Sequence, residues 1–128
     1  MSEPVFLGLD EVIEIHRDQI SRSGGMPGIR DLNLLKSAVA MPAAGIGGDY
    51  LHADVFEMAA ACLFHIVRNH PFFGGNKRTG IVCALVFLIM NGIDFQPDEH
   101  SLEQLVRAVA EEKFDKAAIA RFFRENNG

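Results

Sequence analysis

The residues best suited to chemistry lie together in the stretch HPFFGGNKRTG, residues 70–80. An apolar run, IVCALVFLIM, follows at once and predicts a buried helix that begins near the end of this motif. The first turn of a helix carries partial positive charge and N–H groups that lack a helical partner. Two cations there, Lys77 and Arg78, would repel that charge unless an anion lay between them. The stretch therefore predicts an anion site.

The polar positions of the motif suit a phosphate group. Gly74 and Gly75 have no side chains, so their backbone N–H groups can approach an anion closely. Asn76 is a favoured helix cap, which would place Lys77 and Arg78 in the first helical turn. Free N–H groups and two cationic side chains would then converge on one point. We interpret the loop as a phosphate cradle.

His70 stands at the other edge of the same loop, where its imidazole could accept a proton from an incoming hydroxyl. Phe72 is expected to anchor the loop in the core. The alternative is an ordinary surface loop with a glycine turn and two solvated cations, and an isolated short motif favours that alternative. The motif lacks the GxxxxGK[ST] spacing and no strand precedes it, so the common nucleotide-binding folds match poorly.

Length and composition indicate one soluble globular domain, residues 1–128. The net charge of −5 argues against broad attraction to nucleic acid or to an anionic membrane. Cys62 and Cys83 form no CxxC pair and are predicted to be small core residues. The apolar run 81–90 is too short to span a membrane, and the N-terminus does not resemble a signal peptide. These features favour a reducing cytoplasm.

The spacing of apolar residues predicts an all-α fold, a compact bundle of about six helices with at most one short hairpin or edge strand. The predicted helices cover residues 9–21, 32–42, 55–70, the run after the motif to Met90, the segment after a cap at Asp98 or Ser101, and 114–125. Glycine-rich segments separate the early helices, and the one before residue 55 is predicted to be irregular. A short extended piece is expected at 93–95.

The remaining polar residues have ordinary explanations. No pair of histidines has the spacing of metal ligands on one helix, so structural or solvated roles are expected for four of them: His16, His52, His65 and His100. Asp31 follows a glycine-proline turn and is predicted to cap a helix, whereas a role for Arg30 near a ligand or a partner protein is the minor alternative.

Taken together, these residues resemble the Fic/Doc family. HPFFGGNKRTG is similar to the family signature, and its NKR ending resembles the Doc (death on curing) branch, which usually reads His-x-Phe-x-Asp-Gly-Asn-Lys-Arg-Thr. GGMPGIRDLNLLKSAVAMP resembles a second family segment, GG-x-PG-x-RD with the helix after it. LVFLIMNG resembles the end of the family's core helix. These segments lie in the family's order and cover most of the chain.

The resemblance implies a helical Fic fold that binds ATP with Mg²⁺. By the family pattern, His70 would activate a target hydroxyl, Asn76 and Arg78 would bind phosphates, and Lys77 would help to orient the nucleotide. Arg68 matches an arginine found in Doc and is a further candidate for the site. Doc-like toxins transfer the terminal phosphate of ATP to elongation factor Tu. A Phd-like antitoxin is the implied partner, with nucleic acid contacted only through it.

One position departs from the family pattern. Gly74 stands where the family has Asp or Glu, the expected magnesium ligand, and no carboxylate lies between Glu57 and Asp94. Three explanations are open: a change that attenuates a toxic protein, a natural member with altered activity, or a carboxylate recruited from elsewhere in the fold. The first is favoured. Loss of the carboxylate should weaken catalysis more than binding, because magnesium neutralises the transferred phosphate.

Three functions are therefore compatible with the sequence. The leading hypothesis is a Doc-like kinase toxin, attenuated by Gly74. The second is AMP transfer to a protein hydroxyl, as in most Fic relatives. The third is a module that binds an antitoxin and has lost its chemistry.

Overall fold

The structure is a computed structural model, and it describes residues 3–94 and 96–126. Within these ranges it contains six α-helices, one 3₁₀ turn and one two-stranded hairpin, so the all-α prediction is confirmed. The helices are α1 (Leu9–Ser23), α2 (Leu32–Ala40), α3 (Val55–Asn69), α4 (Asn76–Met90), α5 (Glu99–Ala110) and α6 (Lys116–Glu125). The 3₁₀ turn η1 (Met41–Ala43) extends α2, and β1 (Gly45–Ile46) pairs antiparallel with β2 (Asp49–Tyr50).

Aspartate side chains begin four of the helices, as N-cap residues usually do. Asp31 accepts a hydrogen bond from the Leu34 N–H at 3.0 Å, which confirms its predicted role. Asp54, Asp98 and Asp115 cap α3, α5 and α6 in the same way.

Two sequence predictions differ from the structure, and a third falls partly outside the described residues. The last helix begins at Lys116 and not at Phe114, because Asp115 takes the cap position. The hairpin lies within the glycine-rich segment that was predicted to be irregular. The extended piece expected at 93–95 includes Phe95, which lies outside the described residues.

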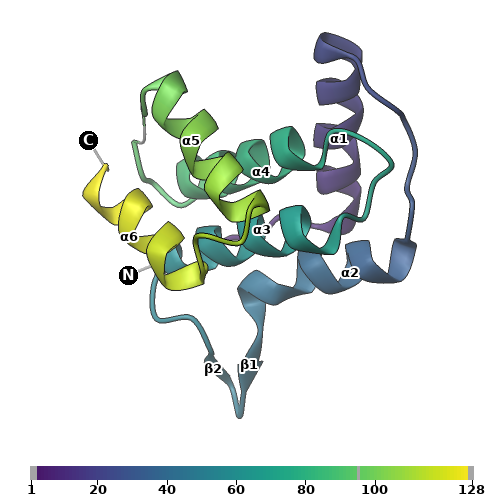
Figure 1. Ribbon diagram of the computed structural model, residues 1–128. Helices are drawn as coiled ribbons and strands as arrows, with labels where there is room; N and C mark the ends of the chain where they lie inside the picture. The colour runs from purple at the N-terminus through teal and green to yellow at the C-terminus, as the bar shows by residue number, and fades with distance from the viewer. Residues whose placement is uncertain (1–2, 95, 127–128) are drawn as a thin grey trace.

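Helix α3 forms the centre of the fold and contacts α2, α4, α5 and α6 (Figure 1). Small side chains let its neighbours approach closely. An added Cβ at Gly80 of α4 would lie only 3.1 Å from Val67 Cγ2 and 3.2 Å from Leu63 Cδ1 of α3. This close crossing fixes the start of α4 beside the end of α3, and the motif loop joins those two ends.

Both cysteines lie in the core, as predicted. A hydrogen bond with Cys62 and burial raise the pKa of the Cys83 thiol, which keeps it in the unreactive neutral form. No helix in the described part of the chain is long and apolar enough to cross a membrane.

Candidate functional site

His70 occupies a specialised backbone position at the end of α3. Its φ of 52° and ψ of 53° lie in the left-handed region, which a non-glycine residue rarely adopts. The following Pro71 disfavours helical geometry at His70, and this stops α3 at Asn69. The imidazole is exposed, so a substrate hydroxyl could reach it.

The loop after His70 is pinned to the segment between α1 and α2. The Pro71 carbonyl accepts hydrogen bonds from the N–H groups of Arg30 at 2.7 Å and Asp31 at 3.0 Å. The Phe73 N–H donates to the Gly28 carbonyl at 3.1 Å. Ile29 and Phe72 form an antiparallel bridge. The second family segment identified in the sequence thus supports the backbone of the first.

Arg30 fastens the base of His70 itself. Its Nε donates to the His70 carbonyl at 2.7 Å, and its Nη2 donates to the Asn69 carbonyl at 3.1 Å. These carbonyls lie at the C-terminal end of α3, where the helix carries partial negative charge and lacks internal donors. Arg30 thus supports the backbone beside His70, and the minor alternative from the sequence, a role near a ligand or the antitoxin, stays a prediction. Arg30 acts on backbone atoms, so we class it as a positioning residue.

Asn76 braces the loop from within. The Phe72 N–H donates to Asn76 Oδ1 at 3.0 Å, and Asn76 Nδ2 donates to the Phe72 carbonyl at 2.9 Å. The side chain is buried, and the N-cap of α4 is Gly75 in a left-handed conformation with a φ of 72°. The prediction that Asn76 caps the helix is therefore wrong by one residue. Its amide bonds to both backbone groups of Phe72, and its predicted contact with phosphate stays a prediction.

His16 of α1 holds the other side of the loop. Its ring stacks on Phe72 with centroids 3.7 Å apart, and its Nε2 forms a 2.8 Å hydrogen bond with the Gly74 carbonyl, which requires the nitrogen to donate. Burial lowers the pKa of His16, the bond to Gly74 opposes this, and the charge of Arg78 lowers it further. The neutral ring is therefore the form that supports the loop. Phe72 is fully buried, as predicted.

The two cations of the motif point to different surroundings. Arg78 donates to the carbonyls of Ser23 at 3.2 Å and Gly24 at 2.6 Å, at the end of α1. Lys77 is exposed and makes no side-chain hydrogen bond or ion pair within the described residues. Lys77 is thus available to an incoming anion, whereas two of the five N–H donors of Arg78 are used at the end of α1, and its predicted contact with phosphate stays a prediction.

The N-terminus of α4 fits a phosphate group. The first backbone bond of this helix runs from the Thr79 N–H to the Gly75 carbonyl at 2.9 Å. The N–H groups of Asn76, Lys77 and Arg78 therefore have no helical carbonyl to bind. Such groups, together with the helix dipole, form an anion-binding position. The predicted cradle has its backbone donors in place.

The position of the missing carboxylate is filled by backbone from another segment. A Cβ built on Gly74 would lie 2.8 Å from the Met26 nitrogen and 3.1 Å from the Met26 oxygen. No acidic side chain forms a hydrogen bond or ion pair with residues 70–78 in the part of the chain that the structure describes. The same residues contain no cluster of three His, Cys, Asp or Glu side chains able to hold a metal. The residues present do not fit a magnesium site.

The partners of the Arg68 side chain lie outside the motif loop. It forms a 2.6 Å ion pair with Glu112 at the junction of α5 and α6, and its guanidinium stacks over the Phe64 ring at 5.1 Å. Among the described residues Arg68 makes no hydrogen bond or ion pair with the motif loop, and its predicted place in the site stays a prediction.

The sequence did not predict that His16 and Arg30 support the backbone of the motif loop. The signal for Arg30 was present in the RD pair after the glycine-proline turn. No signal in the sequence distinguished His16 from other helical histidines, because its partner lies 58 residues away.

Comparison with known proteins gives matches along most of the chain. The Fic/DOC family model matches residues 6–88. A protein named Toxin Doc from Mycolicibacterium smegmatis is 39% identical over 101 residues, which cover 76% of each chain. A protein named Protein kinase doc from Escherichia phage P1 is 31% identical over 119 residues, which cover 93% of each chain.

Proposed function

The chain belongs to the Fic/DOC family, and on this basis we propose that it is a Doc-like toxin that transfers the terminal phosphate of ATP to a hydroxyl of elongation factor Tu. One observation carries the proposal. An exposed His70 and the free N–H groups of the α4 N-terminus stand at the two ends of a single braced loop. The relative named Protein kinase doc supports phosphate transfer as the reaction.

In this proposal each part of the loop has one task. ATP supplies the phosphoryl group. The N–H groups of the first α4 turn and Lys77 would bind its phosphates. His70 would accept the proton of the target hydroxyl as the hydroxyl oxygen bonds to the terminal phosphorus and the bond from that phosphorus to ADP breaks. Arg30 would hold the backbone of His70 in register through the 2.7 Å bond to its carbonyl.

Magnesium has no assigned part in this chain. The Met26 backbone fills the space beside Gly74, so we propose that the wild-type protein reacts slowly. The same observation favours a second candidate function, an antitoxin-binding module without catalysis. A Phd-like antitoxin is the proposed partner in both cases, and a cytoplasmic location stays a prediction.

Labelled ATP and purified elongation factor Tu test the proposal. Label on the terminal phosphate should reach the factor, whereas label on the alpha phosphate should not. His70→Ala should lower the rate by about 10²- to 10⁴-fold, the usual contribution of a general base. His100→Ala, at an exposed histidine on α5, should leave the rate unchanged.

Gly74→Asp should raise the rate only if the segment at Met26 moves aside. Pro27→Gly loosens this segment, so the double variant Gly74→Asp/Pro27→Gly should be faster than Gly74→Asp alone. Transfer of the alpha label would indicate AMP transfer instead. If wild type and both variants transfer neither label and still bind the antitoxin, the chain is a non-catalytic module.

A further inference from the structure

Phe73 is an exposed aromatic side chain in the middle of the motif loop. It is 54% exposed and lies outside the hydrophobic core, whereas its neighbour Phe72 is completely buried. It follows the proposed base His70 by three residues and precedes Asn76, the first residue of α4, by three. Three residues of extended chain span at most about 11 Å, so the Phe73 backbone lies near both the base and the phosphate position.

The Phe73 ring is held in place by the segment between α1 and α2. The Phe73 N–H donates to the Gly28 carbonyl at 3.1 Å, next to the antiparallel bridge between Ile29 and Phe72. A Cβ built on Gly28 would lie 3.4 Å from Phe73 Cδ2 and 3.7 Å from Phe73 Cε2, so one edge of the ring packs against the Gly28 backbone. Gly28 has a φ of 102°, which residues with side chains rarely adopt. The loop therefore presents this ring to solvent in a fixed position.

The ring lies on the same face of the loop as the support of His70. Across the bridge, Gly28 stands opposite Phe73, and Arg30 is two residues further along the same segment. Residues two apart on a paired strand project to the same face. The Arg30 side chain on this face donates to the His70 carbonyl at 2.7 Å. Phe73 and the backbone of the proposed base thus share one exposed face.

The surroundings of the ring are apolar. Met26 is 63% exposed, and its Cβ lies 3.3 Å from a Cβ built on Gly74. Pro27 separates Met26 from Gly28 in the sequence, and none of these residues has a nitrogen or oxygen in its side chain. A purine base is usually oriented by a few polar groups placed around its edge. An aliphatic or aromatic side chain is the better fit to this surface.

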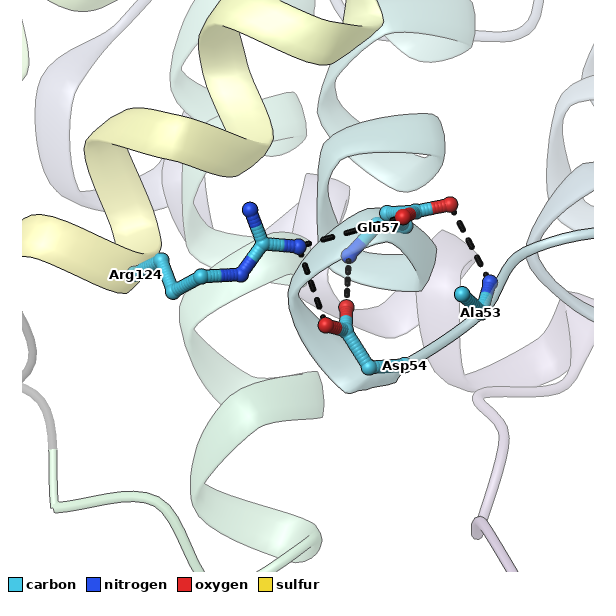
Figure 2. A network of polar contacts seen from close by, with 4 residues as sticks. All are labelled: Ala53, Asp54, Glu57 and Arg124. Carbon is cyan, nitrogen blue, oxygen red and sulfur yellow. Dashed lines mark hydrogen bonds and ion pairs between the residues drawn. The ribbon is translucent and has the colours of Figure 1, made fainter.

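The other end of α3 has a different kind of surface. Arg124 of α6 pairs with Asp54 at 2.9 Å and with Glu57 at 3.8 Å, and Glu57 Oε1 accepts from the Ala53 N–H at 3.1 Å (Figure 2). These polar groups satisfy one another. The Phe73 ring contacts no other aromatic ring and no cation among the described residues. Covering it with an apolar partner would therefore remove apolar surface from water without breaking an existing contact.

We propose that Phe73 binds an apolar side chain of the protein substrate, close in sequence to the hydroxyl that receives the phosphate. This inference rests on the proposed transfer of phosphate to elongation factor Tu. With the acceptor hydroxyl at His70, an extended substrate chain rises about 3.3 Å per residue, so a side chain two or three residues away would reach the ring. Burial of the two side chains would favour targets with an apolar residue at that position.

Binding and transfer, measured separately with elongation factor Tu, test this inference. Phe73→Ser should raise the Kd for the factor, and its KM in the transfer assay, by about tenfold, the lower end of what one apolar contact contributes. The KM for ATP should not change. Phe73→Leu keeps an apolar side chain and should retain most of the affinity. Ile89→Ser, at a 61% exposed position near the end of α4, is the matched control and should change neither constant.

Variants of the factor test the other side of the contact. Replacing the apolar residues within three positions of the phosphorylated residue by Ser should weaken binding to the wild-type chain about tenfold. The same replacements should not weaken binding to Phe73→Ser any further, because residues in direct contact have non-additive effects. Full additivity of the two losses would mean that these side chains do not meet.

The outcomes separate this inference from the proposed function. Equal Kd values for the wild type and Phe73→Ser overturn the inference, and the proposed function stands if the terminal label still reaches the factor. A higher KM for ATP in Phe73→Ser would mean that the nucleotide base covers the ring, which also overturns it. A wild type that binds the factor through Phe73 but transfers no label would overturn the proposed function alone. Absence of binding would overturn both.

Discussion

Two glycine-rich connections of this chain differ sharply in how they are held. The motif loop, residues 70–75, buries Phe72 completely and bonds to α1, to α4 and to the segment before α2. The connection at 44–54 forms a two-residue hairpin that projects from the helical body (Figure 1). Ile46, the residue before its turn, is 85% exposed. Similar composition thus produces a braced loop in one place and a more exposed hairpin in the other.

The difference lies in side chains that bond to the backbone of the motif loop, two of them from distant parts of the sequence. Asn76, His16 and Arg30 each satisfy backbone groups of the motif loop. Polar groups that are buried and satisfied hold one conformation, because every alternative leaves some of them unbonded. The hairpin is held by its own strand pairing, by the Leu51 N–H bond to Ala44 at 2.8 Å, and by exposed contacts of Tyr50, whose hydroxyl donates to Glu3 Oε2 at 3.2 Å and whose ring lies 5.6 Å from that of Phe6. We infer that the motif loop is the more rigid of the two connections.

The largest expected effect comes from removing the internal brace of the motif loop. Asn76→Ala leaves the N–H and C=O of Phe72 without partners in a buried position. Each unsatisfied group costs about 1–3 kcal/mol, so the free energy of unfolding should fall by roughly 2–6 kcal/mol. Urea denaturation measures this loss.

Asn33→Ala is the matched control for that variant. Asn33 is exposed in the first turn of α2, and its replacement should change the free energy of unfolding by less than about 0.5 kcal/mol. Equal losses in the two variants would mean that the Asn76 bonds do not stabilise the loop, and the contrast between the two connections would then fail.

The sequence predicted the fold well and the bracing poorly, for a physical reason. Helix positions follow from local periodicity and caps, so Leu9, Asp31 and Asp98 could mark element boundaries without knowledge of the fold. The bonds from His16 and Arg30 to the motif loop join residues 58 and 40 positions apart. Such contacts depend on how helices pack, and a single sequence carries no local signal for them.

The next largest effect is expected from added volume at the contact between Gly74 and Met26. Gly74→Ala places a methyl group 2.8 Å from the Met26 nitrogen, so the backbone of one segment must shift. Overpacking of this kind costs about 1–3 kcal/mol. The amide resonance of Met26 should also move.

Gly8→Ala provides the comparison for that change. An added methyl there meets only Glu11 Oε1 at an ordinary 3.5 Å, although Gly8 is the N-cap of α1. Its cost should stay below about 1 kcal/mol. If Gly74→Ala lowers the free energy of unfolding no more than Gly8→Ala does, and the Met26 amide resonance does not move, then Gly74 and Met26 are not packed together in solution.

A smaller loss of stability, with a larger effect on activity, is expected for Arg30→Gln. The change removes two hydrogen bonds to the carbonyls of His70 and Asn69, and because Arg30 is exposed the loss should be about 1 kcal/mol. Amide exchange at Phe72 and Phe73 should become faster, and phosphate transfer should slow. Arg22→Gln removes an exposed 2.8 Å ion pair with Asp18 and should change neither measurement. If the Phe72 and Phe73 amides of Arg30→Gln exchange as slowly as those of the wild type, the loop is held without this arginine.

The smallest effect is expected at the hairpin, and it completes the contrast. Ile46→Ser removes an apolar side chain that is already in water, so the free energy of unfolding should change by less than about 0.5 kcal/mol. Phosphate transfer should also be unchanged, because no hydrogen bond joins the hairpin to the motif loop among the described residues. A loss of transfer with normal stability would mean that the hairpin contacts the target protein. The exposure of Ile46 would then be explained by target binding, as the bonds of the motif loop are explained by its proposed part in phosphate transfer.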